Sequence, residues 1–239
     1  MHSILTTADW IGSLPLEVQS AMHEQMRSIT VGTGESVAKA GEAATAMYQV
    51  ESGYLRLTGL QEDGRQVLIT IYGPGACFAE TALVAQRPLN HSTFAMTPAR
   101  VRYLPAAAFW HLYEQHRSIP DALCRKFAAT VSRQLAAREA RAADRLGKRI
   151  ATMFTVLAAD CGRRLPDGNV SVNLAITQTD IAEYFDVTRQ SIQREMTKLK
   201  SRGLVTKVDG AWHISDLVRL HPEQTRSSDC SSINLPHKC

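Results

Sequence analysis

The 239-residue chain has few cysteines and no long apolar run, and both shortages exclude whole classes of protein. The five cysteines are widely spread and show no C-x-x-C spacing, which excludes a disulfide framework, a zinc knuckle and a ferredoxin-like cluster. No run of about 18 apolar residues is present, so the sequence predicts no membrane span. The first residues also lack a basic segment followed by an apolar one, so we expect no secretory signal and a cytoplasmic location.

Signatures of enzymes are missing as well. The sequence contains no P-loop, dinucleotide-binding glycine fingerprint, nucleophile elbow or zinc-ligand spacing. Glu80 and His91 can be imagined as an acid–base pair, but no pattern around them indicates a substrate. We therefore expect no catalytic residue, no metal site and no enzymatic activity.

The charge is unevenly distributed, although the whole chain carries only +4. Residues 1–116 sum to −3, residues 117–207 to +8 and residues 208–239 to −1. This asymmetry predicts two domains and a polyanionic partner for the second. A solvated basic surface would account for the charge equally well.

Glycine-punctuated short apolar stretches over residues 31–104 predict a β-sandwich or β-barrel, an architecture that commonly encloses a ligand. Residues 118–145 lack glycine and proline after Pro120 until Gly147, and predict one helix of about 25–28 residues. One face of this helix carries the candidates for an interface with a second chain: Leu123, Phe127, Val131 and Leu135. Packing of the same face against its own barrel is the alternative.

A third unit follows the long helix. A helix over residues 148–159, two helices that begin after Thr177 and Thr188, and a hairpin over residues 205–214 with an Asp-Gly turn are expected. The predicted units are a β domain over residues 1–116, a linking helix over 117–146, the third unit over 147–218 and a mobile tail over 219–239.

The segment from Thr177 to Met196 has the pattern of a helix-turn-helix. Thr177 is predicted to cap the first helix together with Asp180, Asp186 falls at the turn, where a left-handed residue is needed, and Thr188 caps the second helix. The polar face of the second helix then presents four side chains that can bond base edges: Arg189, Gln190, Gln193 and Arg194.

These side chains suit DNA, because arginine pairs with guanine and glutamine with adenine through two hydrogen bonds each. Hydroxyl and basic groups around them are the predicted phosphate contacts: Thr177, Thr188, Ser191, Lys198, Lys200 and Arg202. Lys207 flanks the same region and could hold a phosphate as well. A helical hairpin with a solvated charged face is the alternative interpretation.

Over roughly residues 10–218 the chain resembles the Crp/Fnr family of bacterial transcription regulators. The motifs that carry the resemblance are Tyr48–Gly53, Asp63-Gly64 and Gly73–Glu80 in the front and Thr188–Arg194 in the rear. The resemblance implies an α+β fold: an N-terminal β-roll of the double-stranded β-helix or jelly-roll type, a long dimerisation helix and a C-terminal winged helix-turn-helix. It also implies a homodimer that binds an inverted repeat in double-stranded DNA and works with RNA polymerase.

The resemblance places an effector pocket in the roll, with these candidates: Ala79, Glu80, Asn90, His91, Ser92 and Arg138. The cyclic-AMP-binding members have Gly-Glu followed ten residues later by Arg-Ser. Here Ala79 replaces the glycine, and Asn90 or His91 replaces the arginine that would face the cyclic phosphate. We therefore expect a small effector other than cyclic AMP.

Other departures concern the cofactor and the operator. Oxygen-sensing members have an N-terminal cysteine cluster, whereas no cysteine precedes Cys77 here, so no iron–sulfur cluster is expected. A haem-based or redox sensor that uses Cys77, His91 or His116 stays as the alternative. Gln190 stands where a glutamate commonly follows the first arginine of the recognition helix, which predicts a changed operator half-site.

Overall fold

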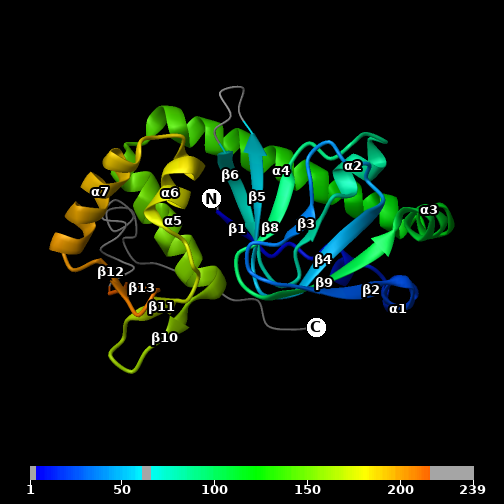
Figure 1. Ribbon diagram of the computed structural model, residues 1–239, viewed down its shortest axis with the longest axis horizontal. Helices are drawn as coiled ribbons and strands as arrows, with labels where there is room; N and C mark the ends of the chain where they lie inside the picture. Colours follow the sequence, from blue (N-terminus) through cyan, green and yellow to red (C-terminus); the bar gives the residue numbers. More distant parts are fainter. Residues whose placement is uncertain (1–3, 61–65, 216–239) are drawn as a thin grey trace, which may run out of the picture.

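The computed structural model describes residues 4–60 and 66–215, without the side chains of residue 66 and residues 140–143. The predicted tail at residues 219–239 lies outside the described residues. Figure 1 shows a β domain and a smaller, mostly helical domain, with one long helix running behind both. This confirms the predicted α+β fold with a β-roll, a long helix and a helix-turn-helix.

The β-roll is built from two sheets. Its strands are β1 (Leu5–Thr6), β2 (Arg27–Val31), β3 (Ser36–Ala38), β4 (Ala46–Ser52), β5 (Leu55–Leu60), β6 (Gln66–Tyr72), β7 (Cys77–Phe78), β8 (Ser92–Ala95) and β9 (Ala99–Pro105). One sheet has the order β1-β6-β5-β8-β3 and the other β2-β9-β4-β7. The turn between β4 and β5 requires glycine, because Gly53 has φ +80° and an added Cβ would lie 2.5 Å from the Pro98 carbonyl oxygen.

Short helices cover the ends of the roll. They are η1 (Ile11–Ser13), α1 (Leu16–Gln25), α2 (Glu80–Val84) and α3 (Ala106–Gln115). Inside the roll, the Phe78 ring stacks between Tyr48 and Tyr72, with centroid distances of 5.0 and 4.9 Å. These three rings therefore occupy part of the interior between the two sheets.

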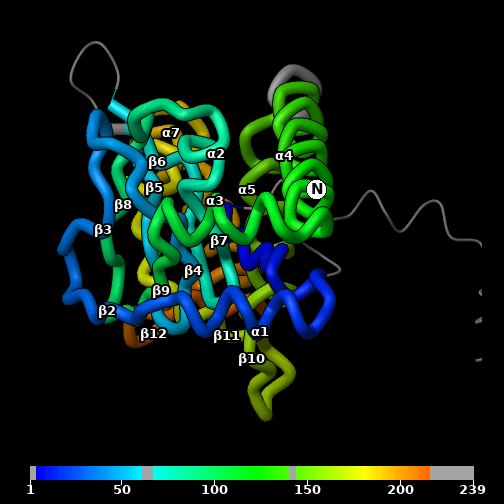
Figure 2. The backbone as a smooth tube through the Cα atoms, turned by 90° about the vertical axis from the view of Figure 1, so that its right-hand side faces the viewer, coloured from blue at the N-terminus to red at the C-terminus, as the bar shows by residue number. Residues whose placement is uncertain are grey.

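Helix α4 (Ser118–Ala143) has 26 residues and begins and ends within two residues of the predicted bounds. In Figure 2 it lies to one side of the roll. Its first turns pack on the chain's own roll: Leu123 is only 2% exposed within a cluster that includes Phe109 and Leu112, and Phe127 packs against the same cluster. Leu123 is therefore not available to a second chain, which corrects the prediction for this residue.

The second domain contains α5 (Leu146–Cys161), β10 (Arg163–Arg164), β11 (Val170–Val172), α6 (Gln178–Phe185), α7 (Arg189–Ser201), β12 (Val205–Val208) and β13 (Ala211–Ile214). The four strands form one sheet in the order β10-β11-β13-β12. The predicted hairpin is confirmed: Asp209 and Gly210 both have positive φ, 48° and 84°, as a type I′ turn requires.

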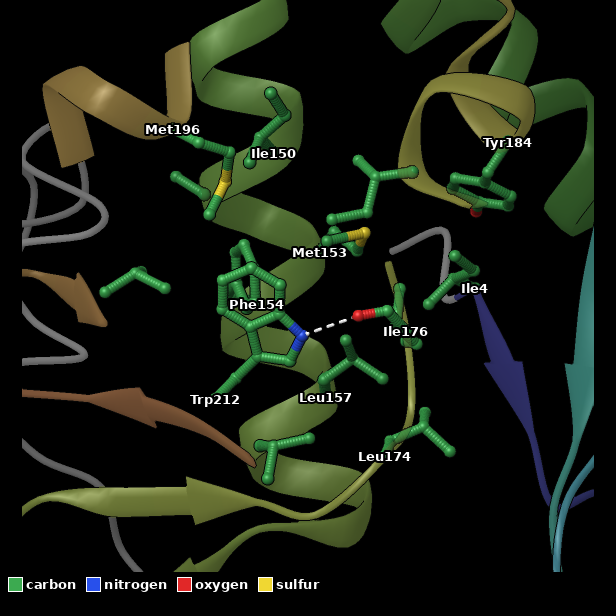
Figure 3. Packing of buried hydrophobic residues seen from close by; sticks show 14 of the residues in the cluster. Ile4, Ile150, Met153, Phe154, Leu157, Leu174, Ile176, Tyr184, Met196 and Trp212 are labelled. Atoms are coloured by element: carbon green, nitrogen blue, oxygen red, sulfur yellow. Dashed lines mark hydrogen bonds between the residues drawn. The ribbon is translucent and has the colours of Figure 1, made fainter. Parts of the chain in front are cut away.

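The core of this domain surrounds Trp212 (Figure 3). The Trp212 ring meets Phe154 of α5 edge-on at 5.2 Å, and its indole nitrogen donates a hydrogen bond of 3.1 Å to the Ile176 carbonyl oxygen. The wing formed by β12 and β13 is thereby fixed to the helices that carry the predicted DNA-binding surface.

The same core continues into the roll. Ile4, Leu68 and Ile71 of the roll belong to one buried cluster with side chains of α5, α6 and α7, and α6 packs against β6. The two domains thus share apolar packing, which holds the helix-turn-helix at a fixed position against the outer face of one sheet. None of the described helices has the length and apolar character needed to cross a bilayer.

Candidate DNA interface and effector pocket

The first helix of the helix-turn-helix is fixed by the predicted capping box. The Thr177 hydroxyl oxygen accepts a hydrogen bond from the Asp180 backbone N–H at 3.1 Å, and Asp180 Oδ2 accepts one from the Thr177 N–H at 2.8 Å. The Thr177 hydroxyl also donates to Asp180 Oδ2 at 2.7 Å. Its hydrogen is committed inside the cap, so the phosphate contact predicted for Thr177 would require this cap to open.

The turn between the two helices also follows the prediction. Asp186 has the left-handed conformation, with φ 54° and ψ 53°, and ends α6. Ala182, only 5% exposed, belongs to the buried cluster that α6 and α7 share. A small residue and a left-handed turn together let the two helices cross closely.

Helix α7 separates an apolar from a polar face. Thr188 caps its first turn by accepting a hydrogen bond of 3.2 Å from the Ser191 N–H. The side chains that point into the core are Ile192, Met196 and Leu199, each no more than 7% exposed. All four predicted base-reading side chains are exposed: Arg189, Gln190, Gln193 and Arg194. The arrangement presents donors and acceptors on one continuous face of a rigid helix.

The predicted phosphate contacts differ in whether their polar groups are already bonded within the chain. Lys200 and Arg202 are exposed at the end of α7. Lys198 is exposed too, but its ammonium group forms an ion pair of 2.7 Å with Glu195. The hydroxyls of Thr188 and Ser191 lie 2.9 Å apart and bond each other at the start of the helix.

A further basic group that the sequence offers as a phosphate contact, Lys207, lies on the wing. The Lys207 ammonium group lies 5.0 Å from the centre of the Trp212 ring, a cation–π geometry that fixes this side chain at the edge of the sheet. Tertiary packing of β12 against α7 brings Lys207 close to the other predicted phosphate contacts, and its role stays a prediction.

In the roll, Glu80 is the most buried of the predicted pocket residues, at 1% exposed. Its Oε1 accepts a hydrogen bond of 2.7 Å from the Trp10 indole N–H and forms an ion pair of 2.6 Å with the Lys126 ammonium group of α4. Lys126 also donates to the Cys77 carbonyl oxygen at 2.7 Å. The carboxylate expected to meet an effector is thus already bonded by two groups of its own chain.

The other predicted pocket residues are less tightly held. Ala79 adopts a left-handed conformation with φ 71°, a position where the related motif has glycine. The Ser92 hydroxyl accepts a hydrogen bond of 3.0 Å from the Ala40 N–H, while Asn90 and His91 are exposed. Although His91 is exposed as a residue, neighbouring atoms partly desolvate its ring, which lowers its pKa. Arg138 is exposed on the second half of α4, and its role as an anion partner stays a prediction.

Two residues of this site escaped sequence analysis. Trp10 and Lys126 lie 70 and 46 positions from Glu80 along the chain. No short-range spacing connects them, and only the packing of η1 and α4 on the roll brings them together.

Cys77 is buried near the Glu80 carboxylate, and its side chain is 3% exposed. Burial and the neighbouring Glu80 carboxylate raise the pKa of its thiol well above the ordinary value, although the Lys126 charge acts in the opposite direction. Among the residues that the structure describes, no three His, Cys, Asp or Glu side chains gather as a metal site would require.

A polar contact joins the roll to the second domain. The Arg56 guanidinium of β5 lies 3.1 Å from Asp180 and 3.0 Å from Glu183 on α6. Next to this contact is a cavity of about 320 Å³, which Val67 of the roll and Arg189 of the recognition helix help to line. The predicted DNA-reading face therefore begins at the boundary between the domains.

Comparison with known proteins agrees with this geometry. Residues 28–116 match the cyclic nucleotide-binding domain family, and residues 148–222 match the Crp-like helix-turn-helix domain family. The CRP-like cAMP-activated global transcriptional regulator of Mycobacterium tuberculosis is 25% identical over 224 residues, which cover 92% of this chain and 98% of that protein. The nitrogen fixation regulation protein FixK of Bradyrhizobium diazoefficiens is 29% identical over 203 residues, covering 81% and 80%.

Solved structures show the same fold. FixK2 from Bradyrhizobium japonicum matches with a TM-score of 0.71 at 18% identity, over 82% of this chain and 96% of that one. CooA from Carboxydothermus hydrogenoformans, a mutant form, matches with a TM-score of 0.71 at 17% identity, over 92% and 97%. With both domain families present in this order and on this fold, the chain belongs to the Crp/Fnr family of transcription regulators.

Proposed function

We propose that this protein is a homodimeric, sequence-specific DNA-binding regulator whose roll responds to a small effector other than cyclic AMP. The observation that carries the proposal is the polar face of α7, which is exposed along its length while the opposite face is buried. A rigid helix with exposed arginine and glutamine side chains at its first turns fits the major groove of DNA. We also propose that the protein acts in the cytoplasm and contacts RNA polymerase, as the resemblance implies.

The chemistry of the face assigns roles within the helix. Arg189 and Arg194 can each bond the O6 and N7 atoms of a guanine, and Gln190 can bond an adenine or, through its carbonyl, accept from a cytosine. A glutamate at position 190 would only accept, so the amide widens the choice of base. Gln193 reaches the same groove one turn later and is the weaker reader.

Dimerisation is supported by the second half of α4. Val131 and Leu135, four residues apart on one face, are 54% and 57% exposed. Large apolar side chains exposed at a helical spacing are typical of a helix that packs against its symmetry mate. In such a dimer two copies of α7 would enter successive major grooves about 34 Å apart, which predicts an inverted repeat as the operator.

The pocket supports an effector other than cyclic AMP, because no arginine stands at Asn90 or His91 and Glu80 is already paired. A ligand of Glu80 would have to present a hydroxyl or ammonium donor that competes with Trp10 and Lys126. The redox alternative gains no support from Cys77, since its side chain is only 3% exposed and its raised pKa disfavours the reactive thiolate. An absorption spectrum of the purified protein tests the haem alternative through the Soret band.

The function is tested by selecting duplexes from a random pool with the full-length protein and then measuring affinity. We expect enrichment of an inverted repeat whose half-sites lie about one helical turn apart. The specific duplex should bind at least about a thousandfold more tightly than a scrambled duplex of the same composition at the same salt concentration. Equal affinity for both duplexes would contradict the proposal.

A further inference from the structure

We propose that residues 4–10, the N-terminal strap, couple the Glu80 junction, where the Glu80 carboxylate contacts Trp10 and Lys126, to the position of the DNA-binding domain. The strap contains Ile4 at one end, β1 (Leu5–Thr6) in the middle and Trp10 at the other end. This inference rests on the proposed function only for its effect on DNA binding; the mechanical coupling stands on the contacts alone.

The strap is fixed along the edge of the roll. β1 pairs in parallel with β6, and the carbonyl oxygens of Ile4 and Thr6 accept hydrogen bonds from the N–H groups of Ile71 at 2.7 Å and Gly73 at 2.9 Å. The Thr70 hydroxyl donates a further bond of 3.1 Å to the Ile4 carbonyl oxygen. The Ala8 carbonyl oxygen accepts a further bond of 3.4 Å from the Cys77 N–H, so alternate carbonyl groups along the strap are bonded to the roll. Because the strap is bonded along this length, a shift at one end is passed toward the other.

One end of the strap is buried in the DNA-binding domain. Ile4 is 0% exposed and belongs to the same cluster as Met153, Ile176 and Tyr184. Figure 3 shows Ile4 on the side of this cluster that faces Ile176 and Tyr184 of the helix-turn-helix region. An apolar side chain of the first residues thus completes the contact between the roll and the second domain.

The other end is bonded to the effector-pocket carboxylate. Trp10 is 5% exposed, and its indole N–H bonds the same Glu80 oxygen that Lys126 contacts. A single buried oxygen atom therefore joins the strap, the roll and α4. A ligand that takes this oxygen removes a buried hydrogen bond from Trp10, which leaves its indole donor unpaired.

The competing route for coupling is the direct contact of Arg56 with α6, which does not involve the strap. The two routes are separated by a change confined to the Trp10 end. Trp10→Phe keeps a large ring in the site but deletes the indole donor, while Arg56 and Ile4 remain unchanged. Leu16→Ala is the matched control, because Leu16 is 79% exposed on α1 just beyond the strap.

Hydrogen exchange of the full-length protein without DNA provides the readout. Losing a buried hydrogen bond to a charged acceptor should accelerate exchange at Ile71 and Gly73 and also in α6 by about tenfold, whereas Leu16→Ala should change neither. Acceleration confined to Ile71 and Gly73, with α6 unchanged, would overturn the coupling.

Coupling must also act in reverse, which protects the test against poor folding of the Trp10 variant. Ile4→Ala, at the far end, should accelerate exchange of the Trp10 indole N–H by about tenfold, with the Trp110 indole N–H as the internal reference. An unchanged Trp10 indole would overturn the proposal.

The regulatory consequence is measured on the duplex selected with the wild-type protein. Trp10→Phe should change the affinity for that duplex by about tenfold, and an unchanged affinity alongside faster exchange in α6 would overturn the regulatory role. Failure of the wild-type protein to bind any duplex would instead contradict the proposed function and leave the exchange results to decide the coupling.

Discussion

Arg56 Nη2 on β5 lies 3.0 Å from Glu183 Oε2 on α6, so a strand of the sensor roll holds the first helix of the helix-turn-helix directly. The same nitrogen lies 3.1 Å from Asp180, whose carboxylate also caps α6. Arg56 Nε is buried and has no hydrogen-bond partner among the described residues. The two side chains are 27% and 20% exposed, so the pair is partly shielded from solvent at the edge of the core that both domains share.

The first prediction concerns this contact. Arg56→Met keeps an apolar stem but leaves Glu183 without its cation, so we expect a loss of about 1–3 kcal/mol in the free energy of unfolding. Arg100→Met is the control, because Arg100 is 60% exposed in its pair with Glu51 and should cost less than about 1 kcal/mol. Chemical denaturation of both variants makes the comparison, and equal losses would contradict a special role for Arg56.

A second prediction is the pH dependence that Glu183 produces. Burial raises the pKa of Glu183 above its ordinary value of 4.5, Arg56 partly offsets this, and Asp180 adds to it. The folded state therefore binds the proton more tightly than the unfolded state. The contribution of Glu183 to stability is present below pH 4.5 and is lost as the pH rises through the raised folded value.

Glu183→Gln removes this titration. The stability of the variant relative to the wild type should increase as the pH rises from 4.5 into the window above it, because only the wild type acquires the buried charge. Urea titrations at several pH values measure the difference. A difference that stays constant with pH would show that Glu183 has the same pKa in both states.

The third prediction is that cyclic AMP does not bind tightly. A buried cyclic phosphate without an arginine partner should lose on the order of 2–5 kcal/mol, which corresponds to at least tens-fold in affinity. The ribose hydroxyl would further have to displace Lys126 from its 2.6 Å pair with Glu80. Calorimetry of the full-length protein should detect no micromolar binding, and a micromolar dissociation constant would contradict the argument.

The fourth prediction is that the dimer interface lies on the second half of α4. Val131→Glu and Leu135→Glu introduce charges at exposed positions of α4, so the chain should stay folded but become monomeric. Leu16→Glu, at a still more exposed apolar residue of α1, should leave the dimer intact. Light scattering after size exclusion measures the mass; an unchanged dimer for both α4 variants would place the dimer interface elsewhere.

Leu123→Ala tests whether the first half of α4 packs on its own roll and not in the dimer interface. Leu123 is 2% exposed in the core of its own roll, so its truncation should lower stability by about 2–5 kcal/mol rather than act through the dimer. If the variant were monomeric with unchanged stability, Leu123 would instead belong to the dimer interface.

What could be predicted from the sequence is largely what neighbouring residues determine. The Thr177–Asp180 cap, the left-handed Asp186 and the Asp209-Gly210 turn each depend on residues within four positions, and the structure confirms all three. A periodic helix likewise depends on spacing alone, which is why the bounds of α4 agree closely with the prediction.

The features that the sequence did not predict depend instead on residues that lie far apart along the chain. The stripe on α4 has one period throughout, and periodicity alone cannot show that its Leu123 end faces the roll while its Leu135 end faces outward. The pairs of Glu80 with Trp10 and of Arg56 with Glu183 join residues 70 and 127 positions apart. Such contacts arise from packing of whole elements, and their partners are ordinary residues in their own local context.

The last prediction separates reading of bases from binding of phosphates. Arg194 is exposed on the polar face of α7, whereas Lys200 is exposed near its C-terminal end. Arg194→Ala should cost about 1–3 kcal/mol on the selected duplex and little on a scrambled one, because a bidentate base contact discriminates between sequences. Lys200→Ala should weaken binding to both duplexes alike and reduce the slope of log K against log salt by about one unit. Titrations of both variants against both duplexes at two salt concentrations make the test, with Thr197→Ala, also exposed on α7, as the control. If Arg194→Ala weakens both duplexes equally, α7 contacts the backbone at this position, and the base-reading face must be assigned to other side chains.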